Sequence, residues 1–191
     1  MAIGSRPSTG ATSPVVSLRG LTPAAADGVE HWFDHPEVDH WLGGRSWIHR
    51  ELRLRLAAPP PGGASRDTTV PRSHAWIALD EARTPVAYIG GDVEDRPTRS
   101  EGPNGPVPCV AGPSPSMSLA YVVDPARWRQ GYGRATIIAA LTCPEIADVQ
   151  TFYCGIDTGN RASQRCVTAA GFRLLDPVPD FEDTLYYSRT R

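Results

Sequence analysis

The 191-residue sequence contains no lysine, so arginine supplies all 19 of its basic residues. Together with 21 acidic residues they leave a formal net charge of −2, which provides no global basic field for binding nucleic acid. No apolar run approaches the roughly 18 residues of a membrane-spanning helix, and the N-terminus lacks the charged-then-apolar layout of a secretory signal. These absences predict a soluble cytoplasmic protein that contacts neither nucleic acid nor membrane.

Cysteine is also scarce. The spacing of the four cysteines matches no common zinc site. We therefore expect no bound metal, and free thiols that are mostly buried small hydrophobes. The four are Cys109, Cys143, Cys154 and Cys166.

Proline and glycine, in contrast, are abundant and clustered, which marks loops. Residues 1–13 are small and polar, and we expect them to be a flexible tail ahead of one domain at residues 14–191. The Pro/Gly-rich stretch from Arg96 to Pro115 is long enough to predict a mobile binding loop.

Hydrophobic periodicity predicts a mixed α/β chain. Thr22 followed by Pro23 is typical of a helix start, with Thr as the N-cap. The predicted strands are 15–21, 74–80, 85–93, 117–123, 149–156, 171–178 and 184–190. The predicted helices begin at residue 23 or span 35–44, 46–57, 133–141 and 161–170.

The stretch DPARWRQGYGRA (Asp124–Ala135) lies where a predicted strand becomes a helix. Gly131 and Gly133 permit a tight turn and the close approach of a ligand. If the helix begins near Gly133, the amides from Arg129 to Ala135 are unpaired N-terminal donors, which bind phosphate. A turn that needs glycine for its geometry alone is the alternative, and neither the dinucleotide fingerprint nor a P-loop is present.

Together with a second stretch, this one resembles the GNAT superfamily of acyl-CoA-dependent N-acetyltransferases. The phosphate-binding motif of that superfamily, Q/R-x-x-G-x-G/A, here reads W-R-Q-G-Y-G over Trp128–Gly133. Its second signature is N-x-x-S/A followed by G-F, and it is met by Asn160, Ser163, Gly171 and Phe172. The resemblance implies a single α/β domain with a central, mostly antiparallel twisted sheet of about six to seven strands. Helices would flank this sheet, which would be splayed between its fourth and fifth strands.

The resemblance further implies acetyl-CoA as cosubstrate. The backbone of Val122 and Val123 would pair with the pantetheine arm, and the Val123 amide would bind the thioester oxygen. Asn160 would hydrogen-bond the pantetheine with support from Ser163, although an N-cap role alone also explains an Asn there. The residues implied to hold the pyrophosphate are Arg129, Gln130, Gly131, Tyr132, Gly133 and Arg134.

Acetyl transfer needs a deprotonated amine, because an alkylammonium (pKa roughly 10) has no lone pair. The sequence departs from the family at two positions that bear on this. Val167 stands where many members carry a Tyr that serves as general acid. Ser118 matches a position at which many carry a Glu.

The remaining acid and base candidates are three acids just past the stretch YIGG (residues 88–91) and one tyrosine. Asp92, Glu94 and Asp95 are candidates for the base, with a solvated loop as the structural alternative. Gly90 and Gly91 are expected to turn the backbone there and leave room for an acceptor. Tyr121 is the candidate acid, with packing against the core or the cofactor as its alternative. The aromatic N-terminal region also places four histidines where they could line a substrate pocket: His31, His35, His40 and His49.

Three functions remain open from the sequence. The segment WFDHPEVDHWLGG, the long middle loop and the ending TLYYSRT resemble aminoglycoside 6′-N-acetyltransferases, which predicts direct attack by a small-molecule primary amine in a ternary complex. Trp128 and the missing Tyr resemble N-terminal protein acetyltransferases, whose acceptor is a peptide N-terminus. A non-catalytic acyl-CoA-binding module is the third. The oligomeric state is open, with a homodimer among the options.

Overall fold

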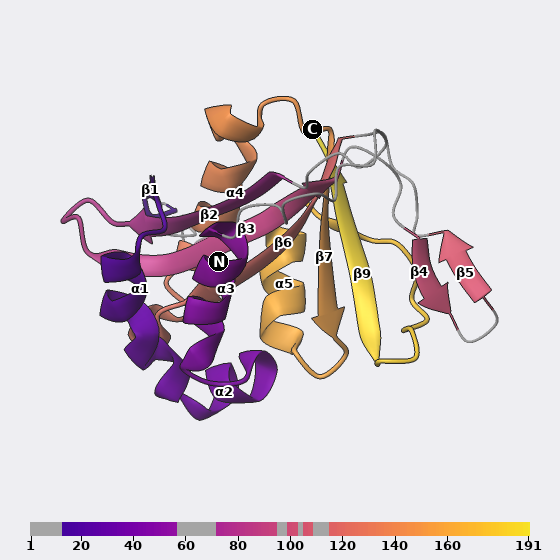
Figure 1. Cartoon of the computed structure of the whole chain (residues 1–191), viewed down its shortest axis with the longest axis horizontal. Helices are drawn as coiled ribbons and strands as arrows, with labels where there is room; N and C mark the ends of the chain where they lie inside the picture. The colour runs from indigo at the N-terminus through magenta and orange to yellow at the C-terminus, as the bar shows by residue number, and fades with distance from the viewer. Residues whose placement is uncertain (1–12, 57–71, 95–98, 103–104, 109–114) are drawn as a thin grey trace, which may run out of the picture.

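A seven-stranded sheet forms the centre of the protein (Figure 1). The computed structural model describes residues 13–56, 72–94, 99–102, 105–108 and 115–191. The predicted tail lies outside these residues except for Ser13, and so do Asp95 and Cys109. The sheet consists of β1 (Ser17–Gly20), β2 (Arg72–Leu79), β3 (Pro85–Glu94), β6 (Ser116–Val123), β7 (Thr151–Asp157), β8 (Arg173–Leu174) and β9 (Thr184–Thr190).

The strand order is β1-β2-β3-β6-β7-β9-β8, and every neighbouring pair is antiparallel except the parallel β6–β7 pair. This parallel pairing is confined to residues 116–118 of β6 and 151–153 of β7. From Leu119 onward β6 diverges from β7, which Figure 1 shows as a widening gap between the two ribbons. The predicted α/β class, the mostly antiparallel sheet and the splay between its fourth and fifth strands are thus confirmed.

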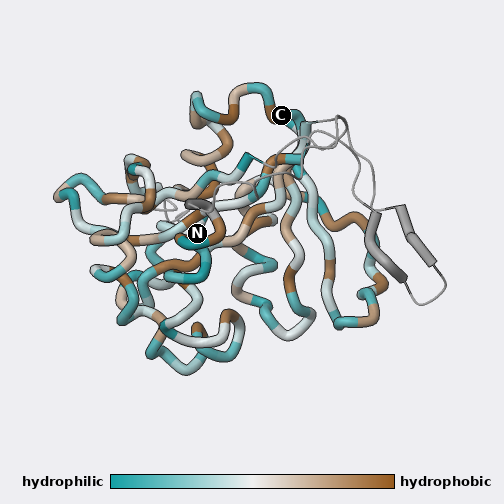
Figure 2. The backbone as a smooth tube through the Cα atoms, in the orientation of Figure 1, coloured by the Kyte–Doolittle hydropathy of each residue, from teal (hydrophilic) through white to brown (hydrophobic). Residues whose placement is uncertain are grey.

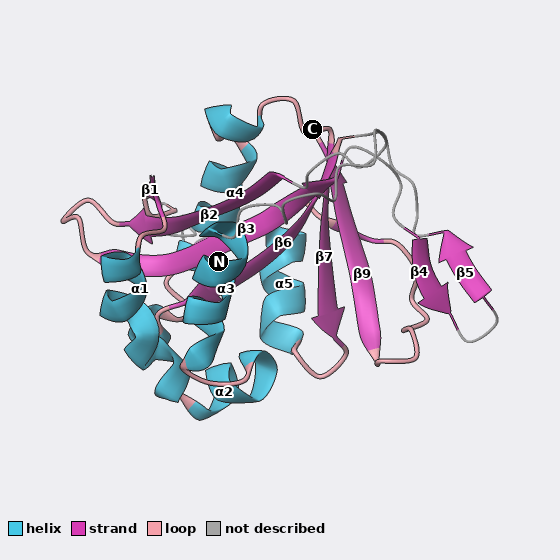
Figure 3. Ribbon diagram, in the orientation of Figure 1, coloured by secondary structure: helices cyan, strands magenta, loops and turns pink. Residues whose placement is uncertain are grey.

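Helices cover both faces of the sheet (Figure 3). On one face, α4 (Tyr132–Leu141) and α5 (Arg161–Ala169) bury Ile137 and Val167 in the larger core. On the other, α1 (Pro23–Val29), α2 (Pro36–Leu42) and α3 (Ser46–Leu56) form a second core with Tyr88 and Val122. Figure 2 shows hydrophobic and hydrophilic residues alternating along α2 and α3, as expected for elements with one buried face.

The helix ends predicted from neighbouring residues agree with the structure. Thr22 Oγ1 accepts a hydrogen bond from Ala25 N at 3.2 Å, and Pro23 occupies the first helical position, as predicted. Gly43 ends α2 with a φ of 84°, a left-handed conformation that glycine adopts without strain. The described residues also contain three short 3-10 helices: η1 (Glu30–Asp34), η2 (Pro125–Arg127) and η3 (Pro144–Ile146).

Two predicted segments differ from the structure. The strand predicted at 171–178 shrinks to the two residues of β8. The reason is a turn in which Asp176 accepts from Val178 N at 2.8 Å, just ahead of Pro179. Within the loop predicted from Arg96 to Pro115, β4 (Arg99–Gly102) and β5 (Gly105–Pro108) form a two-stranded hairpin that stands apart from the main sheet. The predicted mobility of this loop stays a prediction.

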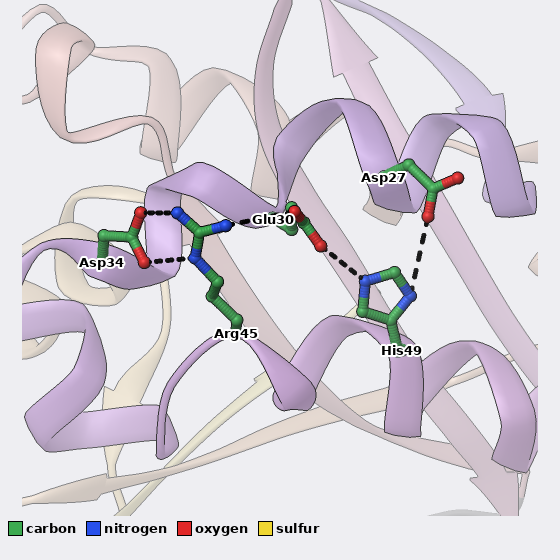
Figure 4. A network of polar contacts seen from close by, with 5 residues as sticks. All are labelled: Asp27, Glu30, Asp34, Arg45 and His49. Atoms are coloured by element: carbon green, nitrogen blue, oxygen red, sulfur yellow. Dashed lines mark hydrogen bonds and ion pairs between the residues drawn. The ribbon is translucent and has the colours of Figure 1, made fainter.

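A chain of charged groups holds α3 against α1 and η1 (Figure 4). Arg45 binds Asp34 with two hydrogen bonds and contacts Glu30 at 3.2 Å. His49 Nε2 lies 3.0 Å from Glu30 Oε2, and its Nδ1 lies 3.9 Å from Asp27. The hydrogen bonds from Arg45 lower the pKa of Asp34. The contact is therefore fully formed at any pH above the usual carboxyl pKa, and it is lost only when the pH falls below that value. Two of the four predicted pocket histidines therefore have other surroundings: His49 lies in this network, and His31 packs against Trp32.

The described cysteines, Cys143, Cys154 and Cys166, are free thiols, as predicted. Burial raises the pKa of Cys154 from 9.0 to about 12. In the unfolded chain this thiol ionises near pH 9, so below that pH the folded state keeps its full stability. As the pH rises from 9 toward 12, only the unfolded thiol ionises, and the free energy of unfolding falls. We expect the free energy of unfolding to fall by about 2 kcal/mol from this thiol between pH 8 and pH 10.5. Urea titrations at both pH values check this, and an equally steep fall in Cys154→Ala would contradict it.

Candidate active site

β6 presents backbone polar groups to the gap where it leaves β7. In an antiparallel pair, residues alternate between those whose N–H and C=O face the partner strand and those whose groups face away. Asp124 N donates to Val86 O at 3.0 Å, which makes Val123 a residue whose backbone groups face away from β3. By the same alternation Tyr121 faces the gap and Val122 faces β3. Tyr121 and Val123, rather than the predicted Val122 and Val123, therefore form the accessible strand edge.

The turn after β6 is shaped by its own side chains. Trp128 Nε1 donates to the Val123 carbonyl at 2.9 Å, and Gln130 Nε2 donates to Ala126 O at 3.1 Å. Arg129 and Gly131 both have left-handed φ angles, 60° and 89°. Glycine adopts this conformation freely, whereas it is strained for Arg129. The turn is thus a specific backbone shape that its side-chain hydrogen bonds hold in place.

The helix α4 begins inside this turn, with Gly131 as its N-cap. Ala135 N donates to Gly131 O at 3.0 Å, so the prediction that free amides extend to Ala135 is wrong by one residue. The amides of residues 131–134 precede the first helical bond and are the N-terminal donors. Together with the helix dipole they suit an anionic group such as a pyrophosphate.

Gly133 also has a packing role that its position in the motif did not predict. A Cβ at Gly133 would lie 2.8 Å from Cys166 Sγ and 3.3 Å from Val123 Cγ2. The missing side chain therefore lets α4 pack closely on α5 and β6, and of the two glycines Gly131 is the one with a left-handed φ. Arg134 is exposed and donates to Ser13 Oγ at 3.3 Å.

The N-terminus of α5 contributes a second set of polar groups. Asn160 Oδ1 accepts from Ser163 N at 3.0 Å, so Asn160 is the N-cap of this helix. This cap uses only the oxygen of Asn160 and leaves its amide nitrogen, which carries two hydrogens. Gln164 Nε2 donates to the carbonyl groups of residues 157–158 and fixes α5 on the end of β7.

Tyr121 lies between these two helices. Its hydroxyl is 2.8 Å from Ser163 Oγ, which joins β6 to α5. Burial raises the pKa of Tyr121 well above its usual value, and the nearby Cys166 thiol raises it further. The phenol is therefore protonated at neutral pH. These contacts place Tyr121 beside the predicted pantetheine contacts, and its role as general acid stays a prediction.

The predicted turn at Gly90 and Gly91 does not occur, because β3 continues to Glu94 and pairs with β6 along its length. Gly91 is needed for another reason. A Cβ there would lie 1.9 Å from Ser118 O, so only glycine allows this approach of the two strands. Asp92 lies directly opposite Ser118 in the strand register. Its carboxylate accepts a hydrogen bond from Ser73 Oγ at 2.5 Å.

The sequence did not predict a further acidic group, which lies on the same face of the sheet as Asp92. Glu51, on α3, accepts a hydrogen bond from Tyr88 Oη on β3 at 3.3 Å. The two residues are 37 positions apart. No motif connects them, so only the packing of α3 on the sheet brings them together.

The helix α2 lies beside the wide end of the β6–β7 gap. His35 at its N-cap packs edge-on against Trp128, with ring centroids 4.5 Å apart. At its other end Trp41 packs over Gly159, where a Cβ would lie 3.2 Å from the indole. A cavity of about 480 Å³ between α2 and α5 is lined by Pro36, Glu37, His40, Trp41, Gly159, Asn160, Arg161 and Ala162. Two of the four predicted pocket histidines, His35 and His40, thus lie at or near this cavity.

Two further findings concern only the part of the chain that the structure describes. No three His, Cys, Asp or Glu side chains gather there as metal ligands would. No described helix is long and apolar enough to cross a bilayer.

A twisted sheet that splays beside a helix N-terminus is the arrangement that the GNAT resemblance implied, and comparisons with known proteins agree. Residues 16–173 match the family model described as "Acetyltransferase (GNAT) domain". The chain belongs to this GNAT acetyltransferase family, as its motifs predicted. It is also 34% identical over 62 residues to the Uncharacterized N-acetyltransferase YfmK of Bacillus subtilis (strain 168), a match that spans 32% of this chain and 42% of that relative.

Solved structures share the fold. The aminoglycoside acetyltransferase AAC(6')-Ib, solved with coenzyme A, superposes with a TM-score of 0.65 at 15% identity, over 92% of this chain and 95% of that one. An aminoglycoside N(6')acetyltransferase of Legionella pneumophila gives 0.63 at 14% identity, over 94% of each chain. An acetyltransferase of Thermus thermophilus gives 0.63 at 18% identity, over 93% of this chain and 97% of that one. At these identities the comparison establishes the fold.

Proposed function

We propose that this acetyltransferase transfers the acetyl group of acetyl-CoA to a primary amine of a small molecule by direct attack in a ternary complex. The observation that carries the proposal is the combination of the strand edge at Tyr121 and Val123, where β6 no longer pairs with β7, with four N-terminal amides at residues 131–134. An extended amide-bearing arm fits the strand edge, and a pyrophosphate fits the helix N-terminus.

The donors present suit coenzyme A along its length. The amides of residues 131–134 would hold the pyrophosphate, with Arg129 and Arg134 adding positive charge. The Asn160 amide nitrogen would donate to the pantetheine. An amide of Tyr121 or Val123 would donate to the thioester oxygen, where negative charge develops during attack. Holding amine and thioester together supplies much of the rate by proximity alone.

A small-molecule acceptor is favoured by the cavity beside α2. Trp41, Glu37 and Arg161 line it next to Asn160. The indole and the carboxylate among these side chains suit a cationic, ring-bearing amine. The solved neighbour AAC(6')-Ib has been captured with kanamycin and with ribostamycin. The fold match extends over more than nine-tenths of both chains, so the likeness is not confined to the cofactor-binding half.

An amine panel tests this function. The protein is incubated with acetyl-CoA and, in turn, kanamycin, spermidine and short peptides, while release of the CoA thiol is followed. We expect release with a small-molecule amine at a rate well above that of acetyl-CoA hydrolysis. Release with peptides alone would instead show an N-terminal peptide acetyltransferase. Tight acetyl-CoA binding without release would show a binding module.

A further inference from the structure

We propose that Glu51 is the carboxylate that receives a proton from the acceptor amine, and that Tyr88 is the residue that positions it. The assignment rests on the proposed transfer to an amine and names the base of that reaction. It comes from the hydrogen bond between Tyr88 Oη and Glu51 Oε2, 3.3 Å long, on the face of the sheet covered by α1–α3.

The strand register locates this pair. Tyr88 lies opposite Val122, and Gly90 lies opposite Ala120. A Cβ on Gly90 would be 2.5 Å from Tyr88 Oη, so the hydroxyl reaches along β3 and lies over Gly90. The hydroxyl is thus level with residues 120–122 of β6. The amide of Tyr121, which faces the gap, lies at the same position along β6.

The acids predicted from the sequence lie farther along the strand. Asp92 is opposite Ser118 and Glu94 is opposite Ser116. At about 3.3 Å per residue, these positions are about 10 Å and about 17 Å from Tyr121, and farther still from Val123. A general base must lie within hydrogen-bond reach of its proton, directly or through one water. The Tyr88 hydroxyl, to which Glu51 is bonded, lies nearer to Tyr121 along the strand direction than either acid.

Tyr88 and Glu51 differ in burial, and this difference suggests which of them positions the other. Tyr88 is completely buried, and its ring packs edge-on against Trp47 with centroids 5.3 Å apart. Its hydroxyl is therefore held in one orientation. Glu51 is only half-buried, so part of its surface stays open to contact. A carboxylate placed there attracts the ammonium form of the acceptor before it accepts the proton.

The proton balance is complete with these groups. The acceptor ammonium loses one proton to Glu51, and the free amine attacks the carbonyl carbon of the thioester. The C–N bond forms, and the C–S bond then breaks. The second proton lost from nitrogen ends on the departing thiolate, giving the CoA thiol. Glu51 returns its proton to solvent, so the step balances without a further reactant.

The test compares kcat for the best amine of the panel in wild type, Glu51→Gln and Glu51→Asp. We expect Glu51→Gln to lower kcat by about 100-fold or more, with acetyl-CoA affinity by calorimetry unchanged. Glu51→Asp should recover kcat to within about tenfold of wild type. Glu81→Gln, in the exposed β2–β3 turn, is the matched control and should match wild type.

A second pair of variants separates chemistry from structure. If Glu51 only satisfies the buried Tyr88 hydroxyl, then Glu51→Gln in a Tyr88→Phe background should cost no further kcat. If Glu51 takes the proton, the double variant should still fall far below Tyr88→Phe alone. A wild-type kcat in Glu51→Gln, or a loss confined to Asp92→Asn, overturns the assignment and leaves the transferase function intact. A wild-type protein that releases no thiol with any amine overturns the proposed function and the assignment with it.

Discussion

Gly131→Val should weaken acetyl-CoA binding by at least about 100-fold. Gly131 has a φ of 89°, and its amide is the first of the four donors at the N-terminus of α4. A β-branched side chain strains this backbone, and its Cβ would lie 3.0 Å from Pro14 Cδ, so the turn that presents the amides would have to shift. Hydrogen bonds to a charged group contribute roughly 1.5–3 kcal/mol each, so losing even two of them gives a change of this size.

Isothermal titration calorimetry with acetyl-CoA measures this effect, after circular dichroism has shown that the variant folds. Gly43→Val is the matched control, because Gly43 also has a left-handed φ, 84°, and a Cβ there would meet no atom within 4 Å. Both variants should lose some stability, and only Gly131→Val should lose the ligand. Wild-type affinity in a folded Gly131→Val protein would refute the pyrophosphate assignment.

Gly91→Ala should destabilise the protein by more than about 3 kcal/mol or prevent folding. A Cβ at this position would lie 1.9 Å from Ser118 O and 2.9 Å from Ser118 C, which are backbone atoms of the neighbouring strand. Backbone cannot rotate away as a side chain can, so β3 and β6 would have to separate. These two strands carry Tyr88 and Tyr121, and a surviving protein should therefore also lose activity.

Gly28→Ala provides the contrast for this second prediction. Gly28 lies in α1, and a Cβ there would meet nothing within 4 Å. Alanine should stabilise the helix by up to about 1 kcal/mol. Urea denaturation of the two variants and wild type measures both effects. A Gly91→Ala protein within about 1 kcal/mol of wild type would contradict the close strand approach.

Features specified by neighbouring residues could be predicted from the sequence. Thr22 and Pro23 start α1 as expected, and the glycine-bearing turn after β6 leads into α4. The Asn160 cap was likewise expected from the residue type alone. In each case the hydrogen bonds or dihedral angles join residues within about one turn of chain, so the local sequence contains the whole cause.

The sequence by itself determined the class of fold, the family and the position of the cofactor loop, because motif and periodicity depend on close neighbours. Only the tertiary structure decided which residues meet across the sheet. It showed that Gly133 is needed for packing, that β3 runs straight past Gly91, and that Glu51 reaches Tyr88. These facts depend on strand register and on how α3 and α5 lie on the sheet. Contacts of this kind join residues tens of positions apart, and their geometry follows from the packing of the whole domain.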